Sequence, residues 1–338
     1  MMLSNRQKLI LKAIVEEYVN TCEPVASFDL MAKPYLNFSS ATLRAEMATL
    51  EQLGLIEKPH TSSGRVPTSY GYRYYVENLV TRDSEVVSDF PLIDQIFQQH
   101  NLMKEEAIKE AMNLLSKLTN YTSMALGADY RSELVKKMDF IPVNEKEAVI
   151  LIVTNLGHVS NQIIKIPNGL KSDDLKKVVS VLDEVLKDKP IVDVEQILSD
   201  EFARMQVKDI MEYQEQIINT FVNAFSKFYK DNYYLSGMSN VFGQPEFNDV
   251  NKLKKFMEAF EEGEVMKLVG NTNGLTVRIG SENKILAMDD CTIISVPYRI
   301  DDEKVGTIAV IGPTRMEYKK VIPLVEYIAG NMTKLYKK

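Results

Sequence analysis

One stretch near the amino end constrains the fold more than any other part of this 338-residue chain. Residues 39–67 open with two serines that can cap a helix, and apolar side chains then recur every three or four positions. Gly54 is typical of a helix end, and a short strand and a Ser/Gly-rich loop closed by Pro67 follow it. This order predicts a winged helix-turn-helix.

The residues upstream supply the remaining helices of such a unit. Residues 4–18 carry an apolar stripe that predicts a supporting helix, and residues 27 to about 33 predict a short second helix. A tight connection then leads to the helix that begins near Ser39. Two other interpretations remain open at this point, a small helical domain and a winged helix that binds protein.

The exposed face of the third helix and the loop after it are candidates for DNA contact. Thr42 and Arg44 lie on a helix face of small and hydrogen-bonding residues, and Arg44 could reach a guanine or a phosphate. Residues 58–75 contain no acidic residue. Donors to phosphate oxygens are expected there at Lys58, His60, Thr61, Ser62, Ser63, Gly64, Arg65 and Arg73.

Several strings of residues resemble one family, the HrcA heat-inducible transcription repressors of bacteria. The N-terminal matches are SATLR from Ser40, LEQLG from Leu50, KPHTSSGR from Lys58 and GYRYYV from Gly71. Near the other end, VRIGSEN from Val277 and GPTRMEY from Gly312 also match. The resemblance therefore covers both ends of the chain.

The resemblance implies a function and a set of partners. Members of the family act as dimers that bind an inverted-repeat operator, the CIRCE element, upstream of chaperone operons that include those for DnaK and GroEL. The GroEL chaperonin keeps the repressor active. On this pattern Ser40, Thr42 and Arg44 belong to the recognition helix, and residues 60–65 form the wing.

The resemblance also implies a fold and two departures from the family pattern. The implied class is α+β, in which a winged helix precedes a GAF-like domain that is interrupted by an inserted α/β dimerisation domain. Phe28 stands where the family usually has a basic residue, and Ala45 where it usually has an asparagine. We therefore expect operator affinity or base preference to differ.

Charge and composition bound the remaining possibilities. The net charge is −7, yet residues 1–80 are neutral, with eight basic and eight acidic residues. DNA affinity must therefore come from local clustering of charge, dimeric contacts and base readout. We expect a steep salt dependence, though less steep than that of a strongly basic protein. The chain has no signal-peptide profile, no membrane span and only two cysteines, which favours a reduced cytoplasm. The resemblance to DNA-binding repressors implies association with the nucleoid.

Enzymatic functions find no support in the residues. The three histidines, at positions 60, 100 and 158, are isolated, so neither a zinc triad nor a Ser–His pair is indicated. Residues 306–314 superficially resemble a phosphate loop, but Pro313 stands where a lysine is needed. We expect no catalytic site, no cofactor and no metal.

The rest of the chain divides into predicted modules. Residues 81–91 read as a linker, 92–133 and 233–338 as the GAF-like domain, and 134–232 as the inserted domain. Strands are expected at 121–126, 134–142, 148–154, 158–167, 275–279, 292–298 and 304–311, and helices at 96–118, 172–186, 197–205, 210–229, 249–260, 264–269 and 318–336.

Two questions stay open after the sequence is read. The aromatic stripe of residues 210–229 fits either core packing or a dimer interface. The GAF-like domain fits either an empty structural core or a small-molecule sensor whose winged helix contacts another protein.

Overall fold

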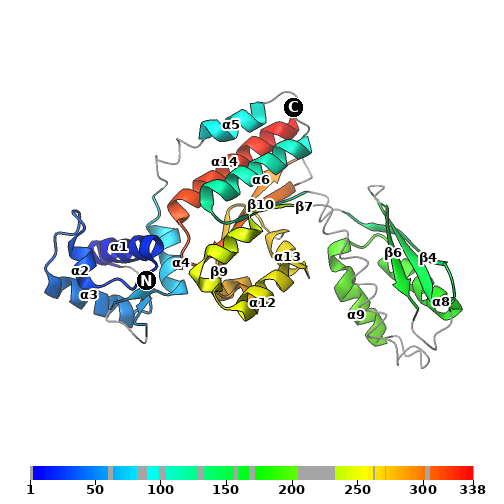
Figure 1. The fold of residues 1–338 in the computed structure, drawn as a ribbon, viewed down its shortest axis with the longest axis horizontal. Coiled ribbons are helices and arrows are strands. Elements are labelled where there is room, and N and C mark those ends of the chain that lie inside the picture. The colour runs from blue at the N-terminus through cyan, green and yellow to red at the C-terminus, as the bar shows by residue number, and fades with distance from the viewer. Residues whose placement is uncertain are drawn as a thin grey trace.

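A winged-helix unit, a central sheet with helices on both faces, and a second smaller sheet follow one another along the molecule (Figure 1). The computed structural model describes residues 3–59, 64–81, 90–98, 104–127, 133–155, 159–166, 172–204, 233–261, 263–270, 272–300 and 305–337. The winged-helix unit and the small sheet lie at opposite ends of the long axis.

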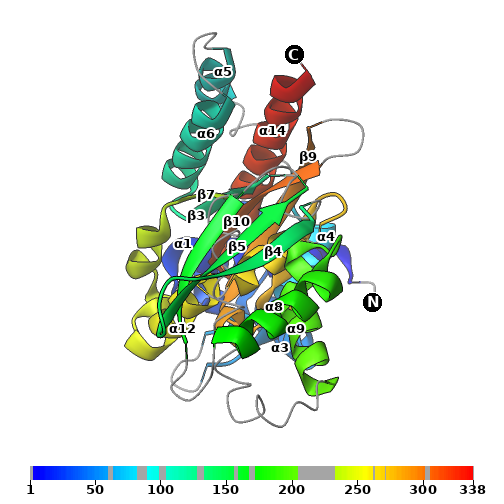
Figure 2. The same cartoon turned by 90° about the vertical axis from the view of Figure 1, so that its right-hand side faces the viewer.

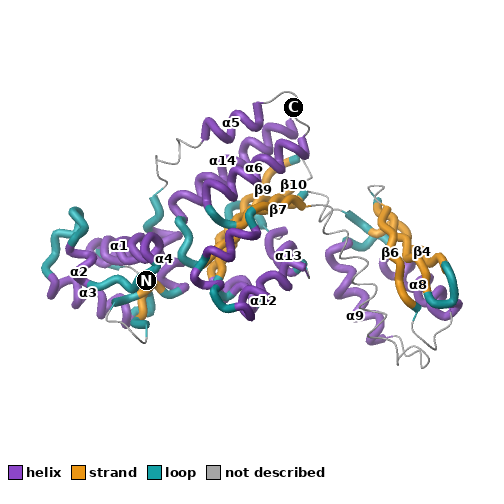
Figure 3. The backbone as a smooth tube through the Cα atoms, in the orientation of Figure 1, coloured by secondary structure: helices purple, strands orange, loops and turns teal. Residues whose placement is uncertain are grey.

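The N-terminal unit has the predicted order of helices and strands. Its elements are, in chain order, α1 (Asn5–Thr21), α2 (Ser27–Met31), α3 (Ser40–Gln52), β1 (Ile56–Glu57), β2 (Val66–Pro67) and α4 (Ser69–Asn78). Figure 3 shows the four helices grouped together. A capping box of Ser4 and Gln7 begins α1. Gly54 has a φ of +72°, the left-handed conformation that ends a helix and that glycine adopts without strain. The winged-helix prediction is therefore confirmed.

The central sheet is antiparallel and has the strand order β7-β3-β10-β9-β8. Its strands are β3 (Thr122–Leu126), β7 (Tyr233–Ser236), β8 (Thr276–Ile279), β9 (Cys291–Arg299) and β10 (Val305–Pro313). Strand β7 was not predicted, and it forms one edge of the sheet. Gly306 and Gly312 lie within β10, so the segment that superficially resembled a phosphate loop is a strand.

Helices cover both faces of this sheet. Alternate residues of β10 face opposite sides: Ile308 and Val310 pack with α14 (Tyr318–Lys337), whereas Ala309 and Ile311 pack with α12 (Val250–Glu261) and α13 (Glu264–Gly270). Figures 1 and 2 both place α5 (Phe90–Gln98) and α6 (Lys104–Thr119) beside α14. The two faces therefore bury two separate apolar layers.

The single helix predicted over 96–118 is wrong. Helices α5 and α6 are separate and pack against each other, and both lie against α14. The apolar stripe that predicted one helix belongs to α6, while Phe90 and Ile93 give α5 its own stripe. The linker predicted over 81–91 lies mostly outside the described residues, and α5 already begins at Phe90.

The second sheet has three antiparallel strands in the order β4-β5-β6, as predicted. It lies in sequence between β3 and β7, which are neighbours in the central sheet. Figure 2 shows its strands beside the helices that follow them in the sequence. The elements are β4 (Val135–Pro142), β5 (Glu147–Thr154), β6 (Val159–Lys165), α8 (Ser172–Leu186) and α9 (Val194–Arg204). The helix predicted over 210–229 lies outside the described residues.

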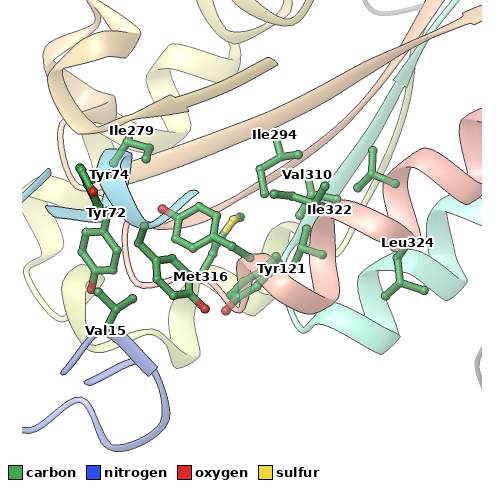
Figure 4. Close-up of a cluster of buried hydrophobic side chains, with 14 of the residues drawn as sticks. Val15, Tyr72, Tyr74, Tyr121, Ile279, Ile294, Val310, Met316, Ile322 and Leu324 are labelled. Carbon is green, nitrogen blue, oxygen red and sulfur yellow. The ribbon is translucent and has the colours of Figure 1, made fainter. Parts of the chain in front are cut away.

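The winged-helix unit and the central sheet share one hydrophobic core (Figure 4). Tyr72 and Tyr75 of α4 lie 6.0 and 6.3 Å, between ring centroids, from Tyr318 at the start of α14. All three side chains are buried. The winged helix is therefore docked on the body of the molecule through α4.

Among the helices that the structure describes, none combines the length and the hydropathy that a bilayer-spanning segment requires.

Candidate nucleic-acid interface

Helix α3 presents one face to the core and the other outward. The hydroxyl oxygen of Ser39 accepts a hydrogen bond from the Thr42 backbone N–H at 3.1 Å and caps the first turn. Buried Leu43, Met47 and Leu50 fix the rotation of the helix. The opposite, exposed face carries Ala41, Arg44, Ala45, Ala48 and Gln52, and its small residues allow a close approach to DNA.

The base of the wing is held by backbone pairing. Strand β1 pairs with β2, and the backbones of Val25 and Arg65 exchange two hydrogen bonds of 2.9 Å. Gly64 approaches Pro24 so closely that a Cβ atom at Gly64 would lie 2.5 Å from the Pro24 carbonyl oxygen. Glycine is therefore required there by packing, a role that the prediction of Gly64 as a phosphate donor did not include.

An open groove lies between α2, α3 and the base of the wing. It has a volume of about 490 Å³ and is lined by Ala26, Ser27, Phe28, Arg44, Met47, Lys58 and Arg65. Arg44 Nε donates to Ser27 Oγ at 3.4 Å, so the guanidinium is directed toward α2. Three cationic side chains from separate elements thus meet in one depression, which we call the cationic groove.

Arg65 forms an ion pair inside this surface. Its Nε donates to Glu51 Oε2 at 2.9 Å, and its Nη2 lies 2.8 Å from the same oxygen. The Arg65 side chain is only 20% exposed. The pair joins the wing to α3 and neutralises part of the charge that the groove would otherwise have.

The other predicted contact residues are placed as follows. Ser40 is half-buried in the first turn of α3, and the Thr42 hydroxyl lies 2.9 Å from the Ser39 hydroxyl. Lys58 is exposed and lines the cationic groove. The loop residues His60, Thr61, Ser62 and Ser63 lie outside the described residues.

Arg73 lies apart from the cationic groove. Its guanidinium forms an ion pair with Glu282, to which Nε donates at 3.0 Å, and it donates to the Val277 carbonyl. Burial lowers the pKa of Arg73, but the hydrogen bonds and the charge of Glu282 outweigh this effect, so its pKa is raised overall. The structure thus gives Arg73 a partner in the body of the molecule.

The sequence analysis did not identify the roles of two residues on this surface. Glu51 was assigned no role, although it holds Arg65. Phe28 was considered only as the loss of a basic residue, yet its ring is 78% exposed and lines the cationic groove. The inward position of Leu30, two residues along α2, is the signal in the sequence that places Phe28 outside.

Comparison with known families accounts for this arrangement. A family model described as a winged helix-turn-helix transcription repressor, HrcA DNA-binding, matches residues 2–79. A second model, the HrcA protein C terminal domain, matches residues 105–322. The chain belongs to the HrcA family. Because HrcA proteins are transcription repressors, membership agrees with the prediction that the chain is not an enzyme.

Curated relatives match over almost the whole chain. A heat-inducible transcription repressor HrcA of Acholeplasma laidlawii is 52% identical, and the match covers 99% of this chain and 98% of the relative. The HrcA proteins of Aster yellows witches'-broom phytoplasma and Brevibacillus brevis are 43% and 37% identical, again over 99% and 98%. A crystal structure described as that of a hypothetical protein shares the fold, with a TM-score of 0.60, 24% identity and 99% coverage of both chains.

Proposed function

We propose that this HrcA family member is a heat-inducible repressor that binds the inverted-repeat CIRCE operator of chaperone operons as a dimer. The cationic groove is the observation that carries the proposal. Arg44 from α3, Lys58 after β1 and Arg65 at the base of the wing converge there beside an exposed helix face of small residues. Proteins that bind in the major groove combine a helix with a face of small side chains and flanking positive charge.

In the proposed complex the contacts divide by role. Arg44 reads a base edge, and Ser40 and Thr42 accompany it on the recognition helix. Lys58, Arg65 and the wing residues His60, Thr61, Ser62, Ser63 and Gly64 contact the sugar-phosphate backbone, which positions α3. We leave Arg73 out of this set, because it does not line the cationic groove and its guanidinium is bound to Glu282 and the Val277 carbonyl in the body of the molecule. Such a protein works at the nucleoid.

Dimerisation is supported by an apolar face of the second sheet. Ile141, Val149 and Ile163 lie in register across β4, β5 and β6. The outer two, Ile141 and Ile163, are 47% and 71% exposed. A second copy of the chain that covered this row would pair two winged helices, and each half-site would then raise the local concentration of the other.

The oligomeric state tests this part of the proposal. Ile163→Lys places a charge in the exposed row, and we expect a monomer by light scattering, with unchanged circular dichroism and weaker operator binding. Gln196→Lys adds the same charge at an exposed position of α9 and serves as the control. An unchanged dimer in Ile163→Lys places the interface elsewhere.

We propose that the central sheet and its helices form a GAF-like core with a structural role. The residues on both sheet faces, such as Ile308 and Ala309, are fully buried against helices. The second sheet with its helices is then the inserted dimerisation domain. The proposed boundaries are 1–80, 81–91, 92–133 with 233–338, and 134–232.

A footprint decides the proposal as a whole. The purified protein is titrated onto DNA from upstream of the chaperone operons and onto a scrambled duplex of equal composition. We expect symmetric protection of an inverted repeat, and a gain in binding when GroEL is added, because large chains misfold more readily. Equal affinity for both duplexes refutes operator recognition, and no gain at any GroEL ratio refutes chaperonin dependence.

A further inference from the structure

The aromatic side chain of Phe28 is exposed to solvent because of its position on α2. Leu30 is fully buried, and this turns Phe28, two positions earlier on α2, away from the core. The Asp29 carboxylate accepts a hydrogen bond of 2.7 Å from the Ala26 backbone N–H, which fixes the first turn. The direction of the ring is thus set by the helix. Because the ring is 78% exposed, it contributes little to the core.

The surroundings of Phe28 are cationic. It lines the groove together with Arg44, Lys58 and Arg65, of which Arg65 is paired with Glu51. The carboxylate on α2, Asp29, is used in the helix cap. An exposed apolar ring among positive charges matches a polyanion that also presents apolar groups, and duplex DNA is such a ligand because thymine carries a C5 methyl group in the major groove.

The position of Arg44 decides which apolar group of DNA is in reach. Arg44 lies in the first half of α3, the part of a recognition helix that meets base edges, and its guanidinium is directed toward Ser27, the neighbour of Phe28. From this arrangement we infer that Phe28 contacts the methyl group of one thymine per half-site and reads that base. The inference rests on the proposed operator binding.

Replacing thymine by deoxyuridine removes only the methyl group, so it isolates the contact. Each thymine of the footprinted site is replaced in turn, and affinity is measured by fluorescence anisotropy at fixed salt. We expect one position per half-site where the unmodified protein loses about fourfold in affinity, the effect of one buried methyl group. Phe28→Ala should lose about as much on the unmodified DNA and nothing more on the uracil probe.

Two variants serve as controls. Phe28→Leu keeps an apolar side chain and should retain part of the thymine preference. Met31→Ala truncates another side chain of α2, 49% exposed and not among those that line the groove, and should behave as the unmodified protein. The helix content and the melting temperature should be unchanged in Phe28→Ala, because the ring is exposed.

The remaining outcomes overturn the inference. If Phe28→Ala loses as much affinity as the unmodified protein at every uracil substitution, the ring touches no thymine methyl group. If Phe28→Ala binds all probes more weakly by the same factor and keeps that sensitivity, the ring contacts a sugar instead. Unchanged affinity would exclude a DNA contact altogether. If the unmodified protein itself fails to distinguish operator from scrambled DNA, the proposed function fails, independently of Phe28.

Discussion

The guanidinium of Arg65 and the carboxylate of Glu51 tie the wing to the recognition helix. Arg65 follows the loop, Glu51 lies in the last turn of α3, and Nε and Nη2 of Arg65 lie 2.9 and 2.8 Å from Glu51 Oε2. The two elements that the proposed complex places against DNA are thus joined to each other before DNA is bound, which reduces the ordering that binding requires.

The first prediction separates positioning by this pair from direct contact. Arg65→Ala should weaken binding to operator and scrambled DNA about equally. Glu51→Ala removes a negative charge near DNA, and by charge alone it should strengthen binding. We expect it instead to weaken operator binding about two- to fivefold, because the wing loses its anchor. Electrophoretic mobility shifts at two salt concentrations measure both effects, and tighter binding by Glu51→Ala contradicts the positioning role.

The second prediction concerns base reading by Arg44. Arg44→Ala should cost about 1–3 kcal/mol of operator binding and much less on scrambled DNA, because a base contact is lost. Lys254→Ala, an exposed cation of α12, is the matched control and should leave both affinities unchanged. Equal losses on both duplexes would reassign Arg44 to a phosphate contact.

The sequence was most informative where short-range rules apply. The serine cap, the buried stripe of Leu43, Met47 and Leu50, and the turn at Gly54 are decided within a few residues. All were predicted, except that the cap was left open between Ser39, where the structure has it, and Ser40. Proximity in space was harder to predict. Glu51 reaches Arg65 across 14 residues and Arg73 reaches Glu282 across 209, and no local pattern identifies such partners.

The same reasoning explains the errors in the body of the molecule. Strand β7 is four residues long and half-buried, so it lacks the alternation that identifies a strand. Arg73 was assigned to DNA because it lies within the acid-free stretch of residues 58–75. The tertiary fold turns α4 toward the central sheet, and the charge of Arg73 is satisfied there.

The third prediction tests that assignment of Arg73. Arg73→Ala should lower the free energy of unfolding by about 1–2 kcal/mol, because the ion pair and the bond to the Val277 carbonyl are partly buried. The slope of operator affinity against salt should stay the same, whereas loss of a phosphate contact would reduce it by about 1. Urea unfolding and a salt titration give the two values, and a reduced slope would return Arg73 to the DNA interface.

The fourth prediction concerns the buried hydroxyl group of Tyr72. The side chain is 2% exposed, and its oxygen has no hydrogen-bond partner among the described residues. Tyr72→Phe keeps the ring packed on Tyr318 and should raise the free energy of unfolding by about 1 kcal/mol. Tyr75→Phe is the contrast, since it removes a hydrogen bond of 3.2 Å to Glu16 and should destabilise the protein. Equal losses in both variants would contradict this reasoning.

The fifth prediction follows from the pKa values of these tyrosines. Burial raises the pKa of Tyr72, Tyr75 and Tyr318 above the usual value near 10. Below about pH 10 both the folded and the unfolded chain keep these protons, so stability does not depend on them. Above that pH the unfolded chain ionises first and binds fewer protons, and the free energy of unfolding must fall by about 1.4 kcal/mol per pH unit for each group.

A comparison of variants isolates this effect from the titration of lysines. The difference in unfolding free energy between the unmodified protein and Tyr75→Phe should be constant from about pH 8 to 9.5 and should then shift in favour of Tyr75→Phe. Urea unfolding followed by circular dichroism across this range measures it. The three rings join α4 to α14, so we expect alkaline pH to weaken the docking of the winged helix on the body of the molecule. If the unfolding free energies of the two proteins stay parallel above pH 10, the buried Tyr75 hydroxyl does not contribute to the loss of stability.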